Sequence, residues 1–80
     1  MDEIITKLGV YITRDILKQP NRTISPDELL ITSGVIDSFS LMDLSLYIED
    51  VFGVRLDDTE LNSETFDTLK KLASLIKSRQ

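Results

Sequence analysis

The chain has 80 residues, of which 41% are hydrophobic, and a formal net charge of −5 at pH 7. A chain of this length forms one small domain with a modest core, and its hydrophobic content favours a folded domain over a disordered one. It contains neither cysteine nor histidine, which excludes disulfides, thiolate or imidazole metal ligands and most nucleophile–base pairs. We therefore expect a single domain over residues 1–80 that is not an enzyme, with no catalytic residues and no metal site.

The acidic residues lie mostly in the middle of the chain. Between Thr23 and Thr68 there are 11 Asp and Glu residues and a single basic residue, Arg55. Nucleic-acid binding is disfavoured, because neutralising phosphates requires a basic patch around the recognition element. Two interpretations of the acidic surface stay open: attraction of basic protein partners, and solubility alone.

Membrane insertion and secretion are not expected either. The apolar runs are short and interrupted by charges, so no transmembrane span is predicted. The first residues, MDEII, lack the basic flank and long apolar stretch of a secretory signal. We therefore expect a cytoplasmic protein.

The first helix is predicted over residues 2–18 and ends before Pro20, because proline disfavours helical geometry in the residue that precedes it. Its predicted core-facing residues are Ile4, Ile5, Leu8, Ile12 and Ile16. The connection that follows, residues 21–36, is long enough to join two nearly parallel helices. We expect a short helical turn at residues 25–28, and at Gly34 a backbone conformation that other residues disfavour.

A central helix is predicted over residues 38–52, with Asp37 as its N-cap and Gly53 just past its end. Its core stripe consists of Leu41, Leu44, Ile48, Val51 and Phe52. Its opposite side is also partly apolar and carries Ser38, Phe39, Met42, Asp43, Leu46, Glu49 and Asp50. Acidic residues are almost never fully buried unless paired, so this second side is interpreted as an exposed docking face. The alternative is a helix that is buried all round.

The remaining segments complete an all-α fold. Residues 57–60, DDTE, lack the ligand spacing of a calcium loop, so no metal site is expected there. Ser63 would cap a short helical turn over residues 63–66, with Phe66 in the core. Asp67 would cap the last helix, from residue 68 to about 78, whose core residues are Leu69, Leu72, Ala73 and Ile76. The prediction is a small bundle of three main helices and one short helix, four helices in all, with a long loop between the first two.

The sequence around Ser38 resembles the modification motif of acyl carrier proteins and of the related peptidyl carrier domains. Residues 34–39 read GVIDSF: a glycine precedes an Asp-Ser pair, and a bulky apolar residue follows. Residues 46–56, LYIEDVFGVRL, resemble the end of the family's central helix. Residues 66–69, FDTL, and 72–76, LASLI, resemble its final helix. The resemblance covers nearly the whole chain and implies the family's fold.

The resemblance also implies a prosthetic group. Ser38 would carry 4′-phosphopantetheine in a phosphodiester linkage, transferred from coenzyme A by a phosphopantetheinyl transferase that uses magnesium. The thiol of this arm would hold an acyl or aminoacyl group as a thioester. Asp37 would cap the helix and assist the modification. Partner enzymes would contact Phe39, Met42, Asp43, Leu46, Glu49 and Asp50.

The function implied is that of an acyl carrier protein, a monomer serving fatty-acid, polyketide or specialised-metabolite biosynthesis. Its partners would be acyl- or aminoacyl-activating ligases, synthases or transferases with basic docking patches. The central helix has fewer acids than the housekeeping fatty-acid carriers, so an aminoacyl carrier (D-alanyl or peptidyl), loaded by an adenylating ligase, is an alternative. An alternative of another class is an acidic helical docking module without a prosthetic group, in which Ser38 is unmodified or phosphorylated. A hydrolase using Ser38 is disfavoured by the missing histidine.

Overall fold

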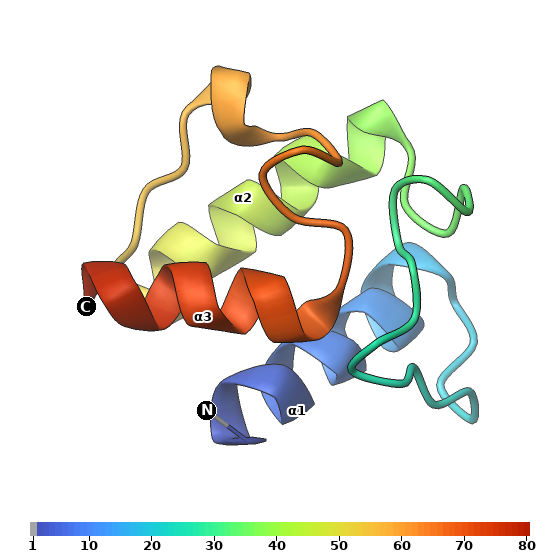
Figure 1. The fold of residues 1–80 in the computed structure, drawn as a ribbon. Helices are drawn as coiled ribbons and strands as arrows, with labels where there is room; N and C mark the ends of the chain where they lie inside the picture. Colours follow the sequence, from blue (N-terminus) through green and yellow to red (C-terminus); the bar gives the residue numbers. More distant parts are fainter. Residues whose placement is uncertain (1) are drawn as a thin grey trace.

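The computed structural model describes residues 2–80, and those residues form helices and loops without a β-strand. The elements in chain order are α1 (Asp2–Tyr11), η1 (Ile12–Ile16), α2 (Ser38–Phe52), η2 (Asp58–Glu60) and α3 (Leu69–Arg79). Figure 1 shows the three α-helices packed together, with the long connection between α1 and α2 running along one side. The predicted all-α fold is confirmed. The description as a four-helix bundle is wrong for the described residues, because the predicted short helix at residues 63–66 is a turn and the short element η2 is a 3₁₀ turn of 3 residues.

The first helical segment ends before Pro20, as predicted, but its last part is not α-helical. After α1 the chain continues as the π-helix η1, and Lys18 leaves it in the left-handed conformation, with φ 57°. The Thr13 hydroxyl donates to the carbonyl oxygens of Gly9, at 3.1 Å, and Val10, at 3.2 Å. A hydroxyl that bonds to the preceding turn competes with the backbone, and here this contact lies at the start of the wider π-helical turns.

Helices α1 and α2 are antiparallel, so the nearly parallel arrangement predicted from the loop length is wrong. The Tyr11 hydroxyl donates to the carbonyl oxygen of Asp43, and the Tyr47 hydroxyl donates to that of Lys7. Later residues of α1 therefore lie beside earlier residues of α2. The connection is long for another reason, since it buries apolar side chains of its own against the core. These are Ile24, Leu30 and Ile36.

The bounds of α2 are those that the sequence predicts. The Asp37 carboxylate accepts the backbone N–H of Ser40 at 2.8 Å, and Gly53 ends the helix in the left-handed conformation. The buried residues of the helix are Leu41, Leu44 and Ile48. Val51 is 42% exposed, contrary to the predicted core stripe. Val51 borders a hollow between the start of α1 and the end of α3. At this end of the bundle the two helices cover the Val51 side chain only partly.

The connection before α2 contains turns rather than a helix. Gly34 has φ 82°, as predicted, in a turn closed by its N–H to the carbonyl oxygen of Ile31 at 3.1 Å. The expected helical turn at residues 25–28 is only a hydrogen-bonded turn, in which the N–H of Glu28 donates to the Ser25 carbonyl oxygen at 3.1 Å.

The segment predicted as a short helix at residues 63–66 is also a turn. Its N–H groups, from Glu64 and Thr65, donate to the Asn62 side-chain oxygen, so Asn62 rather than Ser63 caps it. Phe66 is fully buried, as predicted.

Helix α3 begins one residue later than predicted. Thr68 is its N-cap, with the hydroxyl oxygen accepting the N–H of Lys71 at 3.1 Å, so the prediction that Asp67 caps this helix is wrong. Asp67 instead binds the connection between α1 and α2. The predicted core residues of α3 are all buried: Leu69, Leu72, Ala73 and Ile76.

Candidate functional site

The candidate site lies at the start of α2. Ser38 is the first residue of this helix, and it is exposed. Asp37 has an extended backbone, φ −89° and ψ 177°, which brings its carboxylate back to the N–H of Ser40. Hydrogen bonds to the ionised carboxylate, above all from that backbone N–H, lower the pKa of Asp37. An ionised carboxylate therefore adjoins an exposed serine throughout the neutral pH range.

The helix start at Ser38 fits a covalently attached phosphate. The first N–H groups of an α-helix have no partners within the helix, and they carry the positive end of the helix dipole. A phosphodiester on Ser38 would place its negative charge beside this end, where anions are favoured. Because Ser38 is exposed, attachment there does not require the bundle to open.

The second side of α2 is exposed, as the sequence predicts. Phe39 is 84% exposed, Met42 57% and Leu46 62%. The neighbouring acids Asp43, Glu49 and Asp50 are exposed too. Ile48 on the other side is fully buried. Because only one side of the helix is buried, the alternative of a helix buried all round is wrong. The use of this face for docking stays a prediction.

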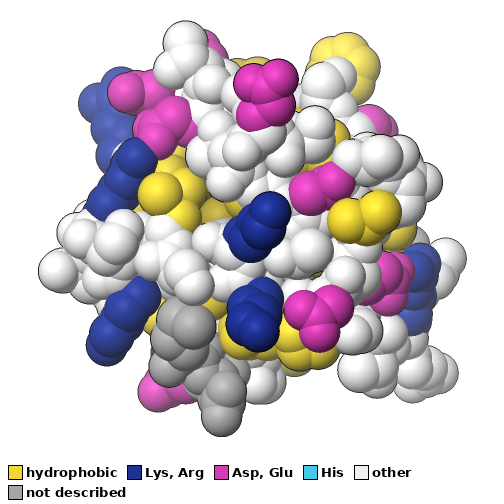
Figure 2. Space-filling view, in the orientation of Figure 1, with side chains coloured by type: hydrophobic (Ala, Val, Ile, Leu, Met, Phe, Trp, Pro, Cys, Tyr) yellow, Lys and Arg dark blue, Asp and Glu magenta, His cyan; other side chains and the backbone are white. Residues whose placement is uncertain are grey.

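Positive charge lies on a different helix from this face. Helix α2 contains no Lys or Arg, whereas α3 carries Lys70, Lys71, Lys77 and Arg79. Figure 2 shows Lys and Arg side chains over α3, with acidic side chains mostly toward the upper and right-hand parts of the view. An uneven charge distribution of this kind orients a charged partner during encounter. A basic partner would be drawn toward α2 rather than α3.

The connection that leads to Ser38 is held by Asp67. One oxygen of its carboxylate accepts the backbone N–H groups of Leu30 at 3.2 Å, Ile31 at 2.7 Å and Thr32 at 3.0 Å. The Thr32 hydroxyl donates to the other oxygen. These bonds, first that of the Thr32 hydroxyl, lower the pKa of Asp67. This contact cannot be predicted from the sequence, because the donors lie 35 to 37 positions away in the chain.

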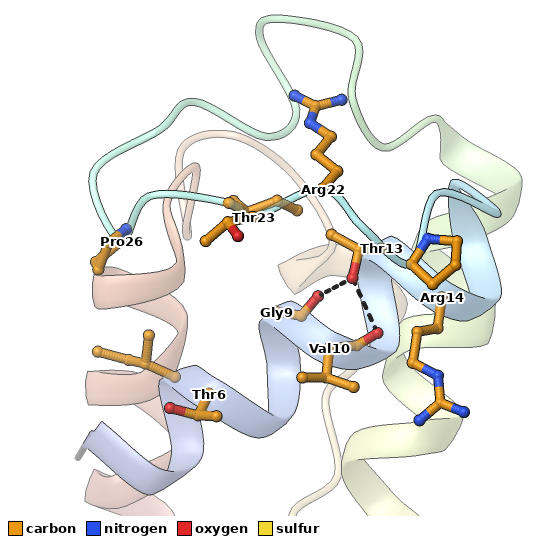
Figure 3. Close-up of a pocket in the computed structure, with 11 residues that line it drawn as sticks. Thr6, Gly9, Val10, Thr13, Arg14, Arg22, Thr23 and Pro26 are labelled. Carbon is orange, nitrogen blue, oxygen red and sulfur yellow. Dashed lines mark hydrogen bonds between the residues drawn. The ribbon is translucent and has the colours of Figure 1, made fainter.

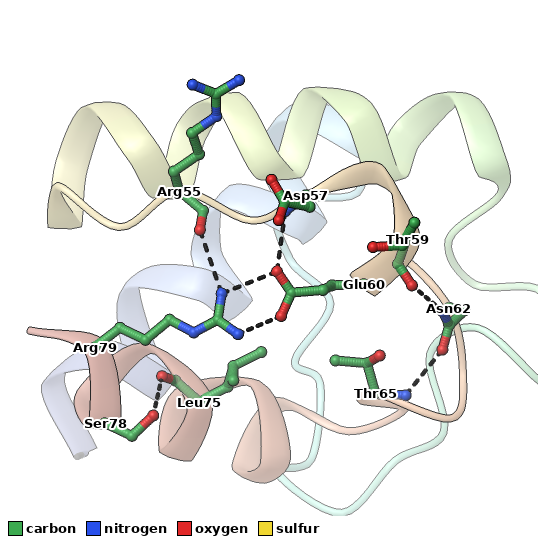
Figure 4. A network of polar contacts seen from close by, with 9 residues as sticks. All are labelled: Arg55, Asp57, Thr59, Glu60, Asn62, Thr65, Leu75, Ser78 and Arg79. Carbon is green, nitrogen blue, oxygen red and sulfur yellow. Dashed lines mark hydrogen bonds and ion pairs between the residues drawn. The ribbon is translucent and has the colours of Figure 1, made fainter.

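A second polar network joins the end of α3 to the connection around η2 (Figure 4). The Arg79 guanidinium donates to the carbonyl oxygen of Arg55 at 3.3 Å and pairs with the carboxylate of Glu60. The same carboxylate accepts the N–H of Asp57 at 3.1 Å. These contacts, led by the bond to Arg79, lower the pKa of Glu60 from 4.5 to about 2. The network is structural, since it adjoins neither Asp37 nor Ser38.

A cavity of about 440 Å³ lies between α1, η1 and the connection after them (Figure 3). Its lining includes Val10, Arg14, Thr23 and Pro26, with the Thr13 hydroxyl bonded to the helix beside it. It contains no residue of α2 and is separate from the candidate site.

Residues 2–80 contain neither a metal-binding cluster nor a membrane-spanning helix. No group of three or more acidic side chains there is arranged to hold a metal ion. Within the same residues, no helix combines the length and apolar character needed to cross a membrane.

This fold and this site are those of a small helical domain with an exposed serine at the start of its central helix. The family model described as the phosphopantetheine attachment site matches residues 12–76. Comparison with curated proteins and with solved structures found no match. Since the matched residues make up most of the chain and include the start of α2, the chain belongs to the phosphopantetheine attachment site family. Members of this family carry covalently attached 4′-phosphopantetheine, and the resemblance drawn from the sequence is confirmed.

Proposed function

We propose that this chain is an acyl carrier protein whose phosphopantetheine arm is attached to Ser38. The observation that carries the proposal is the position of Ser38: exposed, first in α2, directly after its capping acid Asp37, and within the residues that match the family. The chain would deliver acyl or aminoacyl intermediates to partner enzymes and would have no catalytic centre of its own.

Attachment forms one bond and breaks another. The Ser38 oxygen becomes bonded to the phosphorus that carries the pantetheine arm in coenzyme A, and adenosine 3′,5′-bisphosphate leaves. The hydroxyl proton goes to a base of the transferase or to solvent. This chain supplies the exposed hydroxyl, a helix start that favours the negative phosphodiester, and the ionised Asp37 carboxylate beside it. Once attached, the group supplies a thiol that holds the cargo as a thioester.

The exposed side of α2 is the proposed docking face. Phe39, Met42 and Leu46 offer apolar area, and the acidic side chains at its edge, Asp43, Glu49 and Asp50, would attract basic patches of the phosphopantetheinyl transferase and of the ligases, synthases or transferases that handle the cargo. Apolar contacts would supply buried area and the acids would raise the rate of encounter. A carrier must leave each enzyme after delivery, so we expect these complexes to be weak.

Mass measurement tests the attachment. The chain is incubated with coenzyme A, magnesium and a broad-specificity phosphopantetheinyl transferase, and its intact mass is recorded. We expect the mass of one phosphopantetheinyl group to be added to the wild type and none to Ser38→Ala. Ser45→Ala, on the same helix, is the matched control and should be modified fully. Modification of Ser38→Ala, or none of the wild type, would overturn the proposal.

The proposal also covers the chemical class of the cargo. We propose an acyl intermediate of fatty-acid, polyketide or specialised-metabolite biosynthesis, carried by a cytoplasmic monomer. The alternative cargo is an aminoacyl group, D-alanyl or peptidyl, loaded by an adenylating ligase. Mass spectrometry of the species bound to the arm, on protein isolated from its host, distinguishes the two. An acidic docking module without a prosthetic group would bind its partners equally well with and without transferase treatment.

A further inference from the structure

Asp67 holds residues 30–32, in the connection that leads to the candidate site. Its carboxylate accepts three successive N–H groups, and its own backbone carbonyl oxygen accepts the N–H of Leu30 at 2.7 Å. Successive N–H groups that converge on one oxygen form a backbone concavity for an anion. Here the anion is the side chain of Asp67, which lies just before α3 and follows Ser38 in the sequence.

The constraint at Leu30 extends toward Ser38. The N–H of Leu30 is bound to Asp67, and its carbonyl oxygen accepts the N–H of Ile36 at 2.9 Å. Ile36 is buried, with 1% of its surface exposed, and it directly precedes Asp37, the cap of α2. Two hydrogen bonds therefore connect Asp67 to Ile36, the residue before the cap of α2. The N–H of Leu30 is shared between the backbone carbonyl oxygen of Asp67, at 2.7 Å, and its carboxylate, at 3.2 Å, whereas the N–H groups of Ile31 and Thr32 donate to the carboxylate.

We infer that Asp67 is a positioning residue for the attachment of phosphopantetheine to Ser38. The inference rests on the proposed function. Transfer requires the Ser38 oxygen to meet the phosphorus of coenzyme A in a narrow range of geometries, and a misplacement of about 1 Å can lower a rate up to roughly a hundredfold. Without the carboxylate, Ile31 and Thr32 would lose their hydrogen bonds to Asp67, and the segment between the buried Leu30 and Ile36 would sample more conformations. Asp67 acts by limiting them, without contacting the reacting atoms.

A matched pair of variants tests the inference. Asp67→Ala removes the anchor at the start of α3, and Glu60→Ala removes the anchor at its end, which holds the connection around η2 instead. Both are assayed with the transferase at a temperature where circular dichroism shows them folded. We expect kcat to fall about tenfold in Asp67→Ala and by less than about twofold in Glu60→Ala. KM should stay within about twofold in both, because the exposed face of α2 is unchanged.

The split between kcat and KM separates positioning from stability. A variant that is merely partly unfolded offers less substrate and raises the apparent KM, whereas a misplaced Ser38 lowers kcat. A folded Asp67→Ala with the kcat of the wild type, or a loss equal to that of Glu60→Ala, would overturn the inference. A wild type that is not modified at all contradicts the proposed function instead.

Asp67→Asn keeps the inference testable if Asp67→Ala does not fold. Its amide oxygen can still accept the three N–H groups, but the second oxygen becomes an NH₂ group facing the Thr32 hydroxyl. We expect a kcat about threefold below the wild type, with shifted amide resonances for Leu30, Ile31 and Thr32. If Asp67→Ala is unfolded, Asp67→Asn with unchanged resonances and unchanged kcat would overturn the inference.

Discussion

Tyr11 and Tyr47 stack across the interface of α1 and α2, with ring centroids 4.1 Å apart and ring planes inclined by 19°. Each hydroxyl donates to a backbone carbonyl oxygen of the facing helix, so one hydrogen bond runs from α1 to α2 and the other from α2 to α1. Burial, the largest cause, raises the pKa of both phenols. The pair therefore joins the helix that carries Ser38 to α1 without taking part in the candidate site.

Tyr47→Phe and Tyr47→Ala measure this contact in steps. The Phe variant loses one exposed hydrogen bond, worth about 0.5 kcal/mol, and keeps the stack. The Ala variant also loses the aromatic contacts with Tyr11 and Phe52, and we expect a total loss of about 2 kcal/mol. Urea unfolding followed by circular dichroism gives both values. Equal stability of the two variants would show that the stacked rings contribute nothing.

The central helix and its exposed face could be predicted because both depend on neighbours in the sequence. Asp37 caps an N–H three residues ahead, and Gly53 ends the helix through its own left-handed backbone. The three-to-four-residue period then decides which side chains face the core, and it places Met42 and Leu46 outside correctly. Val51 is the exception, because its exposure depends on where the other two helices end.

Contacts between segments that are distant in the chain could not be predicted from the sequence. An acid just before Thr68 reads as a helix cap, and nothing local indicates that Asp67 reaches the loop before α2 instead. The loop length likewise predicts parallel helices, because length alone does not distinguish a loop that crosses the bundle from one that packs its own side chains against the core. The π-helical turns of η1 could not be predicted, because the apolar periodicity of this segment does not distinguish them from α-helical turns.

The Glu60–Arg79 ion pair should make the free energy of unfolding depend on pH. The pKa of Glu60 is lowered from 4.5 to about 2 in the fold, so the folded state binds its proton less readily than the unfolded state does. The stabilisation is therefore fully present above about pH 4.5 and is lost as the pH falls through about 2. Glu60→Gln should melt below the wild type at pH 6, and this difference should shrink steadily toward pH 2.

Thermal unfolding at a series of pH values checks this expectation. Glu64→Gln, which changes an exposed glutamate of the same connection, is the control and should follow the wild type. A difference between Glu60→Gln and wild type that stays constant from pH 6 to pH 2 would mean that the ion pair does not contribute as described.

Charged substitutions on opposite sides of α2 test the assignment of its faces. Met42→Glu and Leu46→Glu change exposed positions, so we expect the free energy of unfolding to move by no more than about 0.5 kcal/mol while turnover by partner enzymes falls. Ile48→Asp places an unpaired charge in the core and should cost about 4 kcal/mol or more. Denaturant titration and a partner assay give the two results. Unfolding by Met42→Glu would show that the faces are reversed.

The two roles assigned to Asp37 can be separated by Asp37→Asn and Asp37→Ala. Asparagine keeps a side-chain oxygen that can accept the N–H of Ser40, so this variant should retain the cap, whereas alanine loses it. Both variants lose the negative charge next to Ser38. If that charge assists the transferase at its metal site, both should be modified roughly tenfold to a hundredfold more slowly than the wild type. Only Asp37→Ala should also melt at a lower temperature.

Rates from intact-mass time courses, compared with melting curves of the same samples, decide between the roles. A normal rate for Asp37→Asn together with a slow rate for Asp37→Ala would show that this residue contributes only as the helix cap. Slow modification of both, with the melting temperature of Asp37→Asn unchanged, would assign it a direct part in the modification of Ser38. Under either role the Asp37 carboxylate carries its charge at neutral pH, since the hydrogen bonds led by that from the N–H of Ser40 lower its pKa.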